Sequence, residues 1–434
     1  MANPYEELPY LCRSIEWTAP ERLALTALLH GGPRQDLDRY RVLELGCGDG
    51  RNLLALAFYR RQGEFVGVDG AASQIRTAES RQRELGITNL HFIHADFTRA
   101  GEQLQGRFDF IIAHGIFSWV PEPVRDALFS LCRDRLKPGG LLYLNYNTKP
   151  GWNVRGMVRE FLLAQTAGEA ALGRRTQQAQ QAAAGMAAGL EQEQHPFSRL
   201  LANEFRFVCD SDPSYVAHEF LATDNHAYWR SEFLALARQQ DLHYVADADF
   251  NYATGRIAAN LPQQLQQQHL TGRNPDDTLD LLCYRQLHTP LLCRGPFTPA
   301  LADSTEFSRL RIASCLQPVS PQQPLWFQHP SGYQVEANDP DFAAALRALG
   351  PLWPRSAPLP TLFSDPAAAR EDLELLHRNG LIELRLAGAP EPDATPNLLN
   401  RLERQWGDTC TSANHFRVEA APVSRQEEAR ACGR

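Results

Sequence analysis

The chain has 434 residues, of which 43% are hydrophobic and 22% charged, and it carries a net charge of -8 with a pI near 5.9. This length predicts two or three domains, and the composition excludes wholesale disorder. The acidic balance argues against a nucleic-acid-binding protein. No run approaches the roughly 20 apolar residues that span a bilayer, and residues 1–11 lack the pattern of a signal peptide, so no membrane contact is expected.

The nine cysteines are scattered along the chain, and none occurs in a CxxC pattern. This argues against a disulfide framework and against a zinc site, so no metal is expected. Reduced thiols favour a cytoplasmic location.

The first 150 residues alternate between strand-like and helix-like segments. Short apolar runs predict strands at 41–46, 64–70, 90–96, 108–114 and 140–147, with helical patterns at 52–62, 73–85 and 122–136. Regular β-α-β alternation with short connections predicts an α/β fold with a doubly wound, Rossmann-like parallel sheet. The C-terminal ends of its strands then share one edge, where ligands bind.

The composition changes after this segment, which predicts further helical and mixed domains. The expected divisions are a sheet domain at 1–155, a helical insertion with an acidic domain at 156–300, a proline-rich linker at 301–330, a small winged-helix-like domain at 331–404 and a polar tail at 405–434. Residues 331–390 carry a net charge of -3, which argues against DNA binding by the winged-helix-like domain.

The strongest chemical signal is Val42-Leu-Glu44-Leu-Gly46-Cys47-Gly48-Asp-Gly50. Alternate glycines let the backbone turn sharply and let a ligand approach closely, although tight turns also use glycine. The dinucleotide fingerprint is G-x-G-x-x-G, whereas this loop is G-x-G-x-G and follows Glu44. A glutamate there opposes a phosphate and attracts a cation, so a ligand with an ammonium group, such as S-adenosylmethionine, fits better than NAD.

Two further strand ends support a nucleoside site. Asp69 ends the second strand, 23 residues after Gly46, where a carboxylate can accept hydrogen bonds from both ribose hydroxyls. The alternative is a cap on the following helix. After the third strand, Asp96 can accept a hydrogen bond from the adenine amino group and Phe97 can pack on the ring; the alternative is a turn aspartate and a core phenylalanine.

These five strands resemble a class I S-adenosylmethionine-dependent methyltransferase. Several strings are similar to a narrower family, the methyltransferases with a methyltransferase regulatory domain, and to rickettsial-type protein-lysine methyltransferases among them. The strings are Tyr5-Glu-Glu-Leu-Pro-Tyr10, His114-Gly-Ile-Phe-Ser-Trp-Val-Pro121, Asn145-Tyr-Asn-Thr-Lys-Pro-Gly-Trp152, Tyr215-Val-Ala-His-Glu-Phe-Leu and Tyr228-Trp-Arg-Ser-Glu-Phe. The resemblance covers residues 1 to about 290, and Leu282 to Cys293 departs from the expected pattern.

The resemblance implies that Gly46, Gly48 and Gly50 line the methionine part of the cofactor, that Asp69 holds the ribose and that Asp96 and Phe97 hold the adenine. His114 and Gly115 follow the fourth strand, where the group to be methylated is positioned. The full set expected to contact the cofactor is Glu44, Gly46, Cys47, Gly48, Gly50, Asn52, Asp69, Gly70, Ala95, Asp96, Phe97, His114 and Gly115.

Four aromatic residues follow strands four and five, and we hypothesise that they form the channel for the methyl acceptor: Phe117, Trp119, Tyr146 and Trp152. Aromatic walls supply dryness and cation–π contact to an amine. Loop packing is the alternative. His114 is a candidate general base, with a core histidine as the alternative, and Tyr146 and Asn147 are candidates for orienting the amine.

The sequence therefore favours an N-methyltransferase that acts on lysine side chains of a protein. The alternatives are a methyltransferase for a peptide or small natural product, and a regulator that binds the cofactor without turnover. Residues 207–280 carry a net charge of -7, nearly the charge of the whole chain. An acidic domain there is expected to attract a cationic protein or peptide substrate, and a solvated acidic surface is the alternative.

Overall fold

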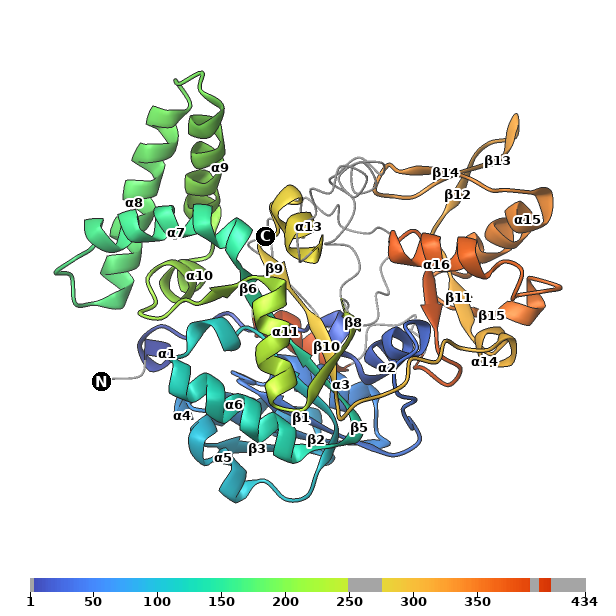
Figure 1. Ribbon diagram of the computed structural model, residues 1–434, viewed down its shortest axis with the longest axis horizontal. Coiled ribbons are helices and arrows are strands. Elements are labelled where there is room, and N and C mark those ends of the chain that lie inside the picture. Colours follow the sequence, from blue (N-terminus) through green and yellow to red (C-terminus); the bar gives the residue numbers. More distant parts are fainter. Residues whose placement is uncertain (1–3, 249–274, 391–397, 407–434) are drawn as a thin grey trace.

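The computed structural model describes residues 4–248, 275–390 and 398–406. Its centre is a seven-stranded sheet, flanked by helices, with a helical arm on one side and a second lobe on the other (Figure 1). In spatial order the strands are β3 (Leu90–His94), β2 (Gly63–Asp69), β1 (Tyr40–Leu45), β4 (Phe108–Ala113), β5 (Leu136–Leu144), β10 (Pro290–Arg294) and β8 (Leu242–Asp247).

Helices cover both faces of this sheet, as expected for a doubly wound fold. One face is packed by α2 (Pro20–Leu29), α3 (Arg51–Tyr59) and α4 (Ala72–Leu85), and the other by α5 (Phe97–Gln103), α6 (Glu122–Arg135) and α11 (Arg230–Gln239). The central strands are largely apolar because helices cover both faces; in β1 every residue except Arg41 is buried.

The sheet is larger and less regular than the sequence predicts. β10 pairs antiparallel with β5 and with β8, so β8 runs parallel to the first five strands. Both strands come from the segment expected to form a separate acidic domain, which therefore completes the sheet. The prediction of a purely parallel sheet confined to residues 1–155 is wrong in this respect.

The alanine- and glutamine-rich segment forms the helical arm, as predicted. It contains α7 (Lys149–Gln165), α8 (Leu172–Leu190), α9 (Pro196–Asp210), α10 (Pro213–Tyr215) and a π-helix, η3 (Val216–Phe220). Ala179, Ala183 and Ala187 are buried at helical spacing in α8, and they share a core with Phe205 and Val208 of α9. This burial makes the arm a packed unit and not a solvated linker.

The second lobe begins earlier than expected. Its elements are α14 (Ser304–Ser308), β11 (Arg311–Ala313), β12 (Gln317–Ser320), β13 (Gln323–Gln328), β14 (Gln334–Glu336), α15 (Pro340–Leu349), η5 (Gly350–Leu352), β15 (Ala357–Pro358), η6 (Leu359–Thr361), α16 (Arg370–Arg378) and β16 (Glu383–Arg385). They pack around one apolar core.

The proline-rich segment is therefore not a linker. β12 and β13 form a hairpin in which Ser320 pairs with Gln323, so that Pro321 lies in the turn. Pro318 lies on β12, an edge strand of its sheet, where a missing N–H is tolerated. The two helices expected in the winged-helix-like domain are present, but β15 intervenes between them and pairs with β11.

Smaller elements complete the described chain. They are α1 (Pro4–Glu7), η1 (Glu16–Thr18), η2 (Phe117–Trp119), β6 (Tyr146–Thr148), β7 (Ala227–Tyr228), α13 (Pro275–Leu282), β9 (Leu287–His288) and α17 (Leu398–Gln405). Leu399 of α17 joins the core of the sheet domain, and the ring of Trp406 lies 4.7 Å from the guanidinium of Arg81. Of the expected tail, residues 407–434 lie outside the described part. No described helix combines the length and apolarity that a membrane crossing requires.

Candidate active site

The glycine loop joins β1 to α3 at the edge where the parallel strands end. Gly46, Gly48 and Gly50 have φ values of 72°, 53° and 77°, in a backbone region that residues other than glycine rarely adopt. Each also faces a close neighbour: a Cβ on Gly48 would collide with Sγ of Cys12, and one on Gly46 would lie 2.6 Å from Cγ2 of Ile116. The loop therefore requires glycine for conformation and for space.

Glu44 lies directly before this loop and is buried. Its Oε1 accepts a hydrogen bond of 3.0 Å from Nδ2 of Asn52, whereas its Oε2 is buried with no hydrogen-bond partner. Burial raises the pKa of Glu44 to about 8. An unpartnered carboxyl oxygen beside a glycine loop fits a ligand that carries an ammonium group, as S-adenosylmethionine does.

Asp69, at the end of β2, closes the loop from the other side. Its Oδ2 accepts a hydrogen bond of 2.9 Å from the amide of Gly48, and its Oδ1 accepts one of 2.8 Å from the amide of Ala71. Burial raises its pKa. The bond to Gly48 fixes the loop. The bond to Ala71 closes a turn before α4, whose N-cap residue, Ala71, has no side-chain cap, so Asp69 does not cap this helix and its assignment to the ribose stays a prediction. Gly70 beside it is exposed.

The two residues expected to bind the adenine ring, Asp96 and Phe97, are at least partly exposed. Asp96 is exposed and caps α5, accepting a hydrogen bond of 2.8 Å from the amide of Thr98, as the alternative interpretation required. Phe97 is half-buried, and its Cζ lies 3.8 Å from the position of a Cβ on Gly46. Ala95 is buried at the end of β3 and Cys47 is buried in the glycine loop. Phe97 thus reaches the loop, and the assignment of Asp96 and Phe97 to adenine stays a prediction.

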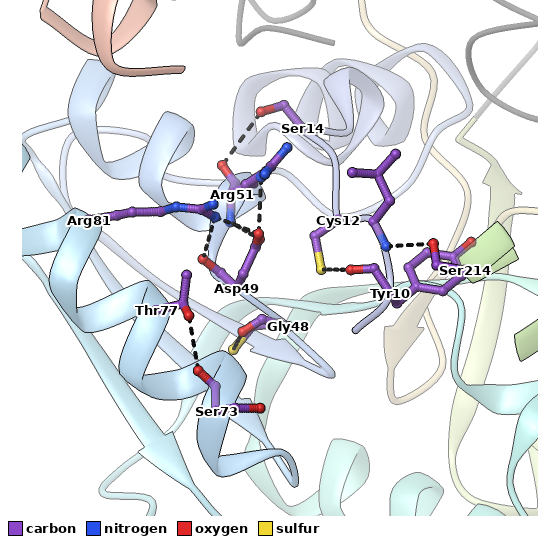
Figure 2. A network of polar contacts seen from close by, with 12 residues as sticks. Tyr10, Cys12, Ser14, Gly48, Asp49, Arg51, Ser73, Thr77, Arg81 and Ser214 are labelled. Atoms are coloured by element: carbon purple, nitrogen blue, oxygen red, sulfur yellow. Dashed lines mark hydrogen bonds and ion pairs between the residues drawn. The ribbon is translucent and has the colours of Figure 1, made fainter. Parts of the chain in front are cut away.

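The N-terminal segment lies over the glycine loop (Figure 2). Leu11 N donates a 3.1 Å hydrogen bond to Oγ of Ser214, and Sγ of Cys12 lies 3.5 Å from the carbonyl of Tyr10. A cavity of about 490 Å³ is lined by this segment and by Ser73 and Arg81 of α4. At its floor, Asp49 forms ion pairs with Arg51, at 3.0 Å, and with Arg81. The sequence assigned no role to these residues, although Tyr5 to Tyr10 belongs to a string that carried the resemblance.

His114 follows β4 and is half-buried at the same edge. Its Nδ1 lies 2.9 Å from the hydroxyl of Tyr143, which also accepts a 2.8 Å hydrogen bond from Nε1 of Trp17. The amide of Gly115 donates a 2.6 Å bond to Oδ1 of Asn145. His114 and Gly115 thus lie at the edge where the parallel strands end, and each is held by a hydrogen bond; their contact with the cofactor stays a prediction.

The four aromatic residues do not line one channel. Phe117 and Tyr146 belong to the core: their rings lie 5.4 Å and 3.9 Å from the ring of Phe233 on α11. Trp119 and Trp152 form a separate edge-to-face pair with centroids 5.2 Å apart, and of the four only Trp119 is partly exposed. The rings of Phe117 and Tyr146 therefore pack in the core, as the loop-packing alternative expects. The amide of Asn147 donates to Oγ of Ser118, and its Nδ2 is buried without a partner.

The sequence missed a buried charged cluster beside Tyr146. Nε2 of His288 lies 2.8 Å from Asp280 and its Nδ1 lies 3.4 Å from Asp247, while Arg285 lies 2.6 Å from Asp280. The two carboxylates raise the pKa of His288 against the effect of burial, and His288 and nearby arginines hold the pKa of Asp247 below its usual range. No local motif could have revealed the cluster, because Asp247 is 41 residues before His288 and meets it through the pairing of β8 with β10.

Comparisons with known proteins agree with this geometry. Residues 42–140 match the family described as methyltransferase domain, and residues 212–294 match the predicted methyltransferase regulatory domain. An uncharacterized protein of Rickettsia prowazekii is 32% identical over 294 residues, which cover 68% of this chain and 53% of that protein. Trans-aconitate 2-methyltransferase of Deinococcus radiodurans is 30% identical over 102 residues, which cover 24% of this chain and 36% of that enzyme. The chain thus matches about half of the length of the rickettsial relative.

Among solved structures, PKMT2 from Rickettsia typhi in complex with AdoHcy shares the fold, with a TM-score of 0.75, 22% identity and coverage of 89% of this chain and 79% of that one. The first family match covers the glycine loop, and the second covers the added strands β8 and β10. The chain therefore resembles, in two segments of its sequence and in its fold, the methyltransferases that carry a methyltransferase regulatory domain.

Proposed function

We propose that the protein transfers a methyl group from S-adenosylmethionine to lysine side chains of a protein substrate. The observation that supports S-adenosylmethionine as the cofactor is the Oε2 of Glu44, which is buried without a hydrogen-bond partner near the end of β1. It lies next to a loop of three glycines whose backbone is in the left-handed region. When bound, S-adenosylmethionine supplies an electrophilic methyl group on a positively charged sulfur.

The chain's own residues have to hold this cofactor in one orientation. Glu44 offers Oε2 to the ammonium group, and Asn52 fixes the carboxyl through Oε1. Asp69 holds the loop through the amide of Gly48 and lies where it can also accept hydrogen bonds from the ribose. Such alignment of two reactants can supply roughly 7–11 kcal/mol of the barrier reduction.

The acceptor is proposed to approach over the ends of β4 and β5. His114, held by Tyr143, and the partly exposed Trp119 lie in the connections after β4. An indole face stabilises a cationic side chain, and a partly dry site lowers the pKa of a lysine so that its amine loses the proton. The acidic balance of residues 207–280 supports a cationic substrate, although residues 249–274 lie outside the described part of the chain.

The resemblance to rickettsial-type protein-lysine methyltransferases supports lysine as the acceptor, and the fold shared with PKMT2 of Rickettsia typhi agrees with it. The test is incubation of the purified protein with methyl-labelled S-adenosylmethionine and a lysate of the source organism, followed by mass spectrometry. Label on protein lysines is the expected result. Label confined to small molecules or short peptides would contradict the proposal and favour the natural-product alternative, and absence of label together with tight cofactor binding would favour a regulator.

A further inference from the structure

The helix α17 follows the second lobe in the chain but packs on the sheet domain. Leu399, near its start, is buried in the sheet-domain core, and Leu402 and Trp406 pack against the same core. These three residues follow one another at spacings of three and four residues, so they share one face of the helix. That face is therefore fixed against the core to which α3 and α4 also contribute.

Trp406 contacts two side chains of α4 at once. Its ring lies 4.7 Å from the guanidinium carbon of Arg81, and its Nε1 donates a 3.2 Å hydrogen bond to Oε2 of Glu84. Arg81 and Glu84 are three residues apart and so lie on the same face of α4. An indole ring attracts a guanidinium electrostatically, and more strongly where water is excluded. Since Arg81 is only 9% exposed, the ring restricts the orientation of its side chain.

Arg81 in turn holds the cofactor loop. Its Nη1 forms an ion pair with Oδ2 of Asp49 and lies 3.4 Å from the carbonyl oxygen of the same residue (Figure 2). Asp49 is buried and stands between Gly48 and Gly50. The guanidinium thus binds both the side chain and the backbone in the middle of the loop, and charge-assisted hydrogen bonds of this kind are the stronger ones.

The helix α4 also packs directly against this loop. A Cβ on Gly50 would lie 2.9 Å from Cβ of Ala78, which precedes Arg81 by three residues. Glycine has more conformational freedom than any other residue, so a loop with three glycines depends on its contacts to keep one conformation. The contacts of α4 with Asp49 and Gly50 supply part of this restraint, and a shift of α4 would change them.

The ion pair between Arg81 and Asp49 borders a cavity. Both residues line the cavity of about 490 Å³ that lies under the N-terminal segment. Water that enters this cavity can compete with Asp49 for the guanidinium, and an arginine side chain released from its partners regains rotamer freedom. The indole of Trp406 opposes that release, because it holds the guanidinium from the side of α17.

We propose that Trp406 is a positioning residue for S-adenosylmethionine, which acts on the glycine loop through Arg81 and Asp49. Cofactor binding then depends on the docking of α17, and by reciprocity the bound cofactor favours the docked helix. This role rests on the proposed function, since it takes the glycine loop as the cofactor site, but it does not depend on which molecule accepts the methyl group.

The test is calorimetry of S-adenosylmethionine with the wild-type protein, Trp406→Ala and Trp406→Phe. We expect the Kd to rise about fivefold in Trp406→Ala and to stay within twofold in Trp406→Phe, because a phenyl ring still faces the guanidinium. The matched control is Leu402→Ala, which removes apolar packing from the same helix but takes no ring from Arg81. It should lower the free energy of unfolding and leave the Kd within twofold. An unchanged Kd in Trp406→Ala, or an equal rise in Leu402→Ala, would overturn the proposal.

A double-mutant cycle tests the route through Arg81. Arg81→Gln should itself raise the Kd of S-adenosylmethionine, and Trp406→Ala should add less than a twofold rise in that background, because residues that act through one contact are not additive. Rises that multiply in the double variant would show that Trp406 does not act through Arg81 and would overturn the proposal.

Amide hydrogen exchange of the wild-type protein tests the reciprocal effect and needs no variant to fold. Saturating S-adenosylhomocysteine should slow exchange in residues 398–406 at least threefold and leave the β13–β14 hairpin, residues 323–336, unchanged. Unchanged exchange in 398–406, or equal slowing of both segments, would overturn the role of α17. A wild-type protein that binds neither S-adenosylmethionine nor S-adenosylhomocysteine would overturn the proposed function as well.

Discussion

Nδ2 of Asn52 donates a 3.0 Å hydrogen bond to Oε1 of Glu44 and leaves Oε2 of the same carboxyl buried without a partner. Asn52 is itself held, because its Oδ1 accepts a 2.9 Å bond from the amide of Ile15. Glu44 is the next-to-last residue of β1 and Asn52 is the second residue of α3, so the glycine loop between these elements sets the position of the free oxygen. The Glu44 carboxyl is therefore held in one orientation, as the proposed cofactor site requires.

This arrangement predicts a pH dependence of cofactor binding. At pH 7 a Glu44 with a pKa of about 8 is mostly neutral in the unliganded protein, whereas a bound ammonium group favours its charged form. The affinity for S-adenosylmethionine should therefore rise between pH 7 and pH 8.5, with release of protons. Calorimetry across this range measures it, and Glu44→Gln should bind more weakly and with a smaller pH dependence. A wild-type affinity that falls with pH would contradict the prediction.

The same pKa has an opposite consequence for the empty protein. Because the folded-state pKa of Glu44 lies above the unfolded value near 4.3, its contribution to stability is fully present below that value and is lost as pH rises towards and through 8. The Tm of the unliganded protein should fall more steeply between pH 5 and pH 8 than that of Glu44→Gln. Identical slopes for the two proteins would show that Glu44 does not carry the effect.

Gly48 and Gly86 form a matched pair for testing the cofactor loop. Both have left-handed φ values, 53° and 63°, so alanine costs roughly 1–2 kcal/mol of conformational strain at either. A Cβ on Gly86 meets nothing within 4 Å, whereas one on Gly48 meets Sγ of Cys12. We expect Gly86→Ala to lower only the free energy of unfolding, and Gly48→Ala also to weaken cofactor binding at least tenfold. Equal cofactor affinity in both variants would rule out a role for this contact.

The parts of the site that the sequence predicts are those set by local pattern. The three glycines, Asp69 and the five parallel strands follow from a motif, a spacing and the apolar runs between them. The contact between the N-terminal segment and η3 could not be placed in this way, because Tyr5 and His218 are more than 200 residues apart and meet only in the folded protein.

The predictions that the structure corrects also failed because they depend on contacts between residues far apart in the sequence. Phe117 and Tyr146 follow strands, as channel residues would, but Phe233 on a distant helix packs against both rings. Likewise β8 and β10 extend the sheet only because β10 pairs antiparallel with β5. Proline content predicts a linker at 301–330, but the pairing of β12 with β13 accommodates Pro318 at a sheet edge and Pro321 in a turn.

Phe117 and Trp119 belong to the same 3-10 turn, and substituting each in turn distinguishes packing of the core from contact with the methyl acceptor. Phe117 is buried against Phe129 and Phe233, so Phe117→Ala should lower the free energy of unfolding by about 3–5 kcal/mol. Trp119 is partly exposed, so Trp119→Ala should destabilise less and lower methyl transfer about tenfold with an unchanged cofactor Kd. Urea unfolding, calorimetry and the labelling assay measure these effects. An unchanged turnover of Trp119→Ala would remove it from the acceptor site.

The cluster around His288 should stabilise the junction of β8, β9 and α13 in a pH-dependent way. Asp247 and Asp280 raise the pKa of His288 above its unfolded value near 6.5, so its stabilisation is full below that value and is lost as pH rises through the folded-state pKa. His288→Gln removes one cation from Asp247 and Asp280, while Arg285 still pairs with Asp280, so the cost should stay below the roughly 3–5 kcal/mol of a fully broken buried pair. The loss in unfolding free energy relative to wild type, measured by urea denaturation, should therefore be larger at pH 6 than at pH 9.

His243→Gln is the control. His243 lies on β8, the strand that carries Asp247, and among the described residues its ion pair is with the more exposed Asp241. A deficit for His288→Gln that is equal at both pH values would mean that His288 acts through packing and not through its charge.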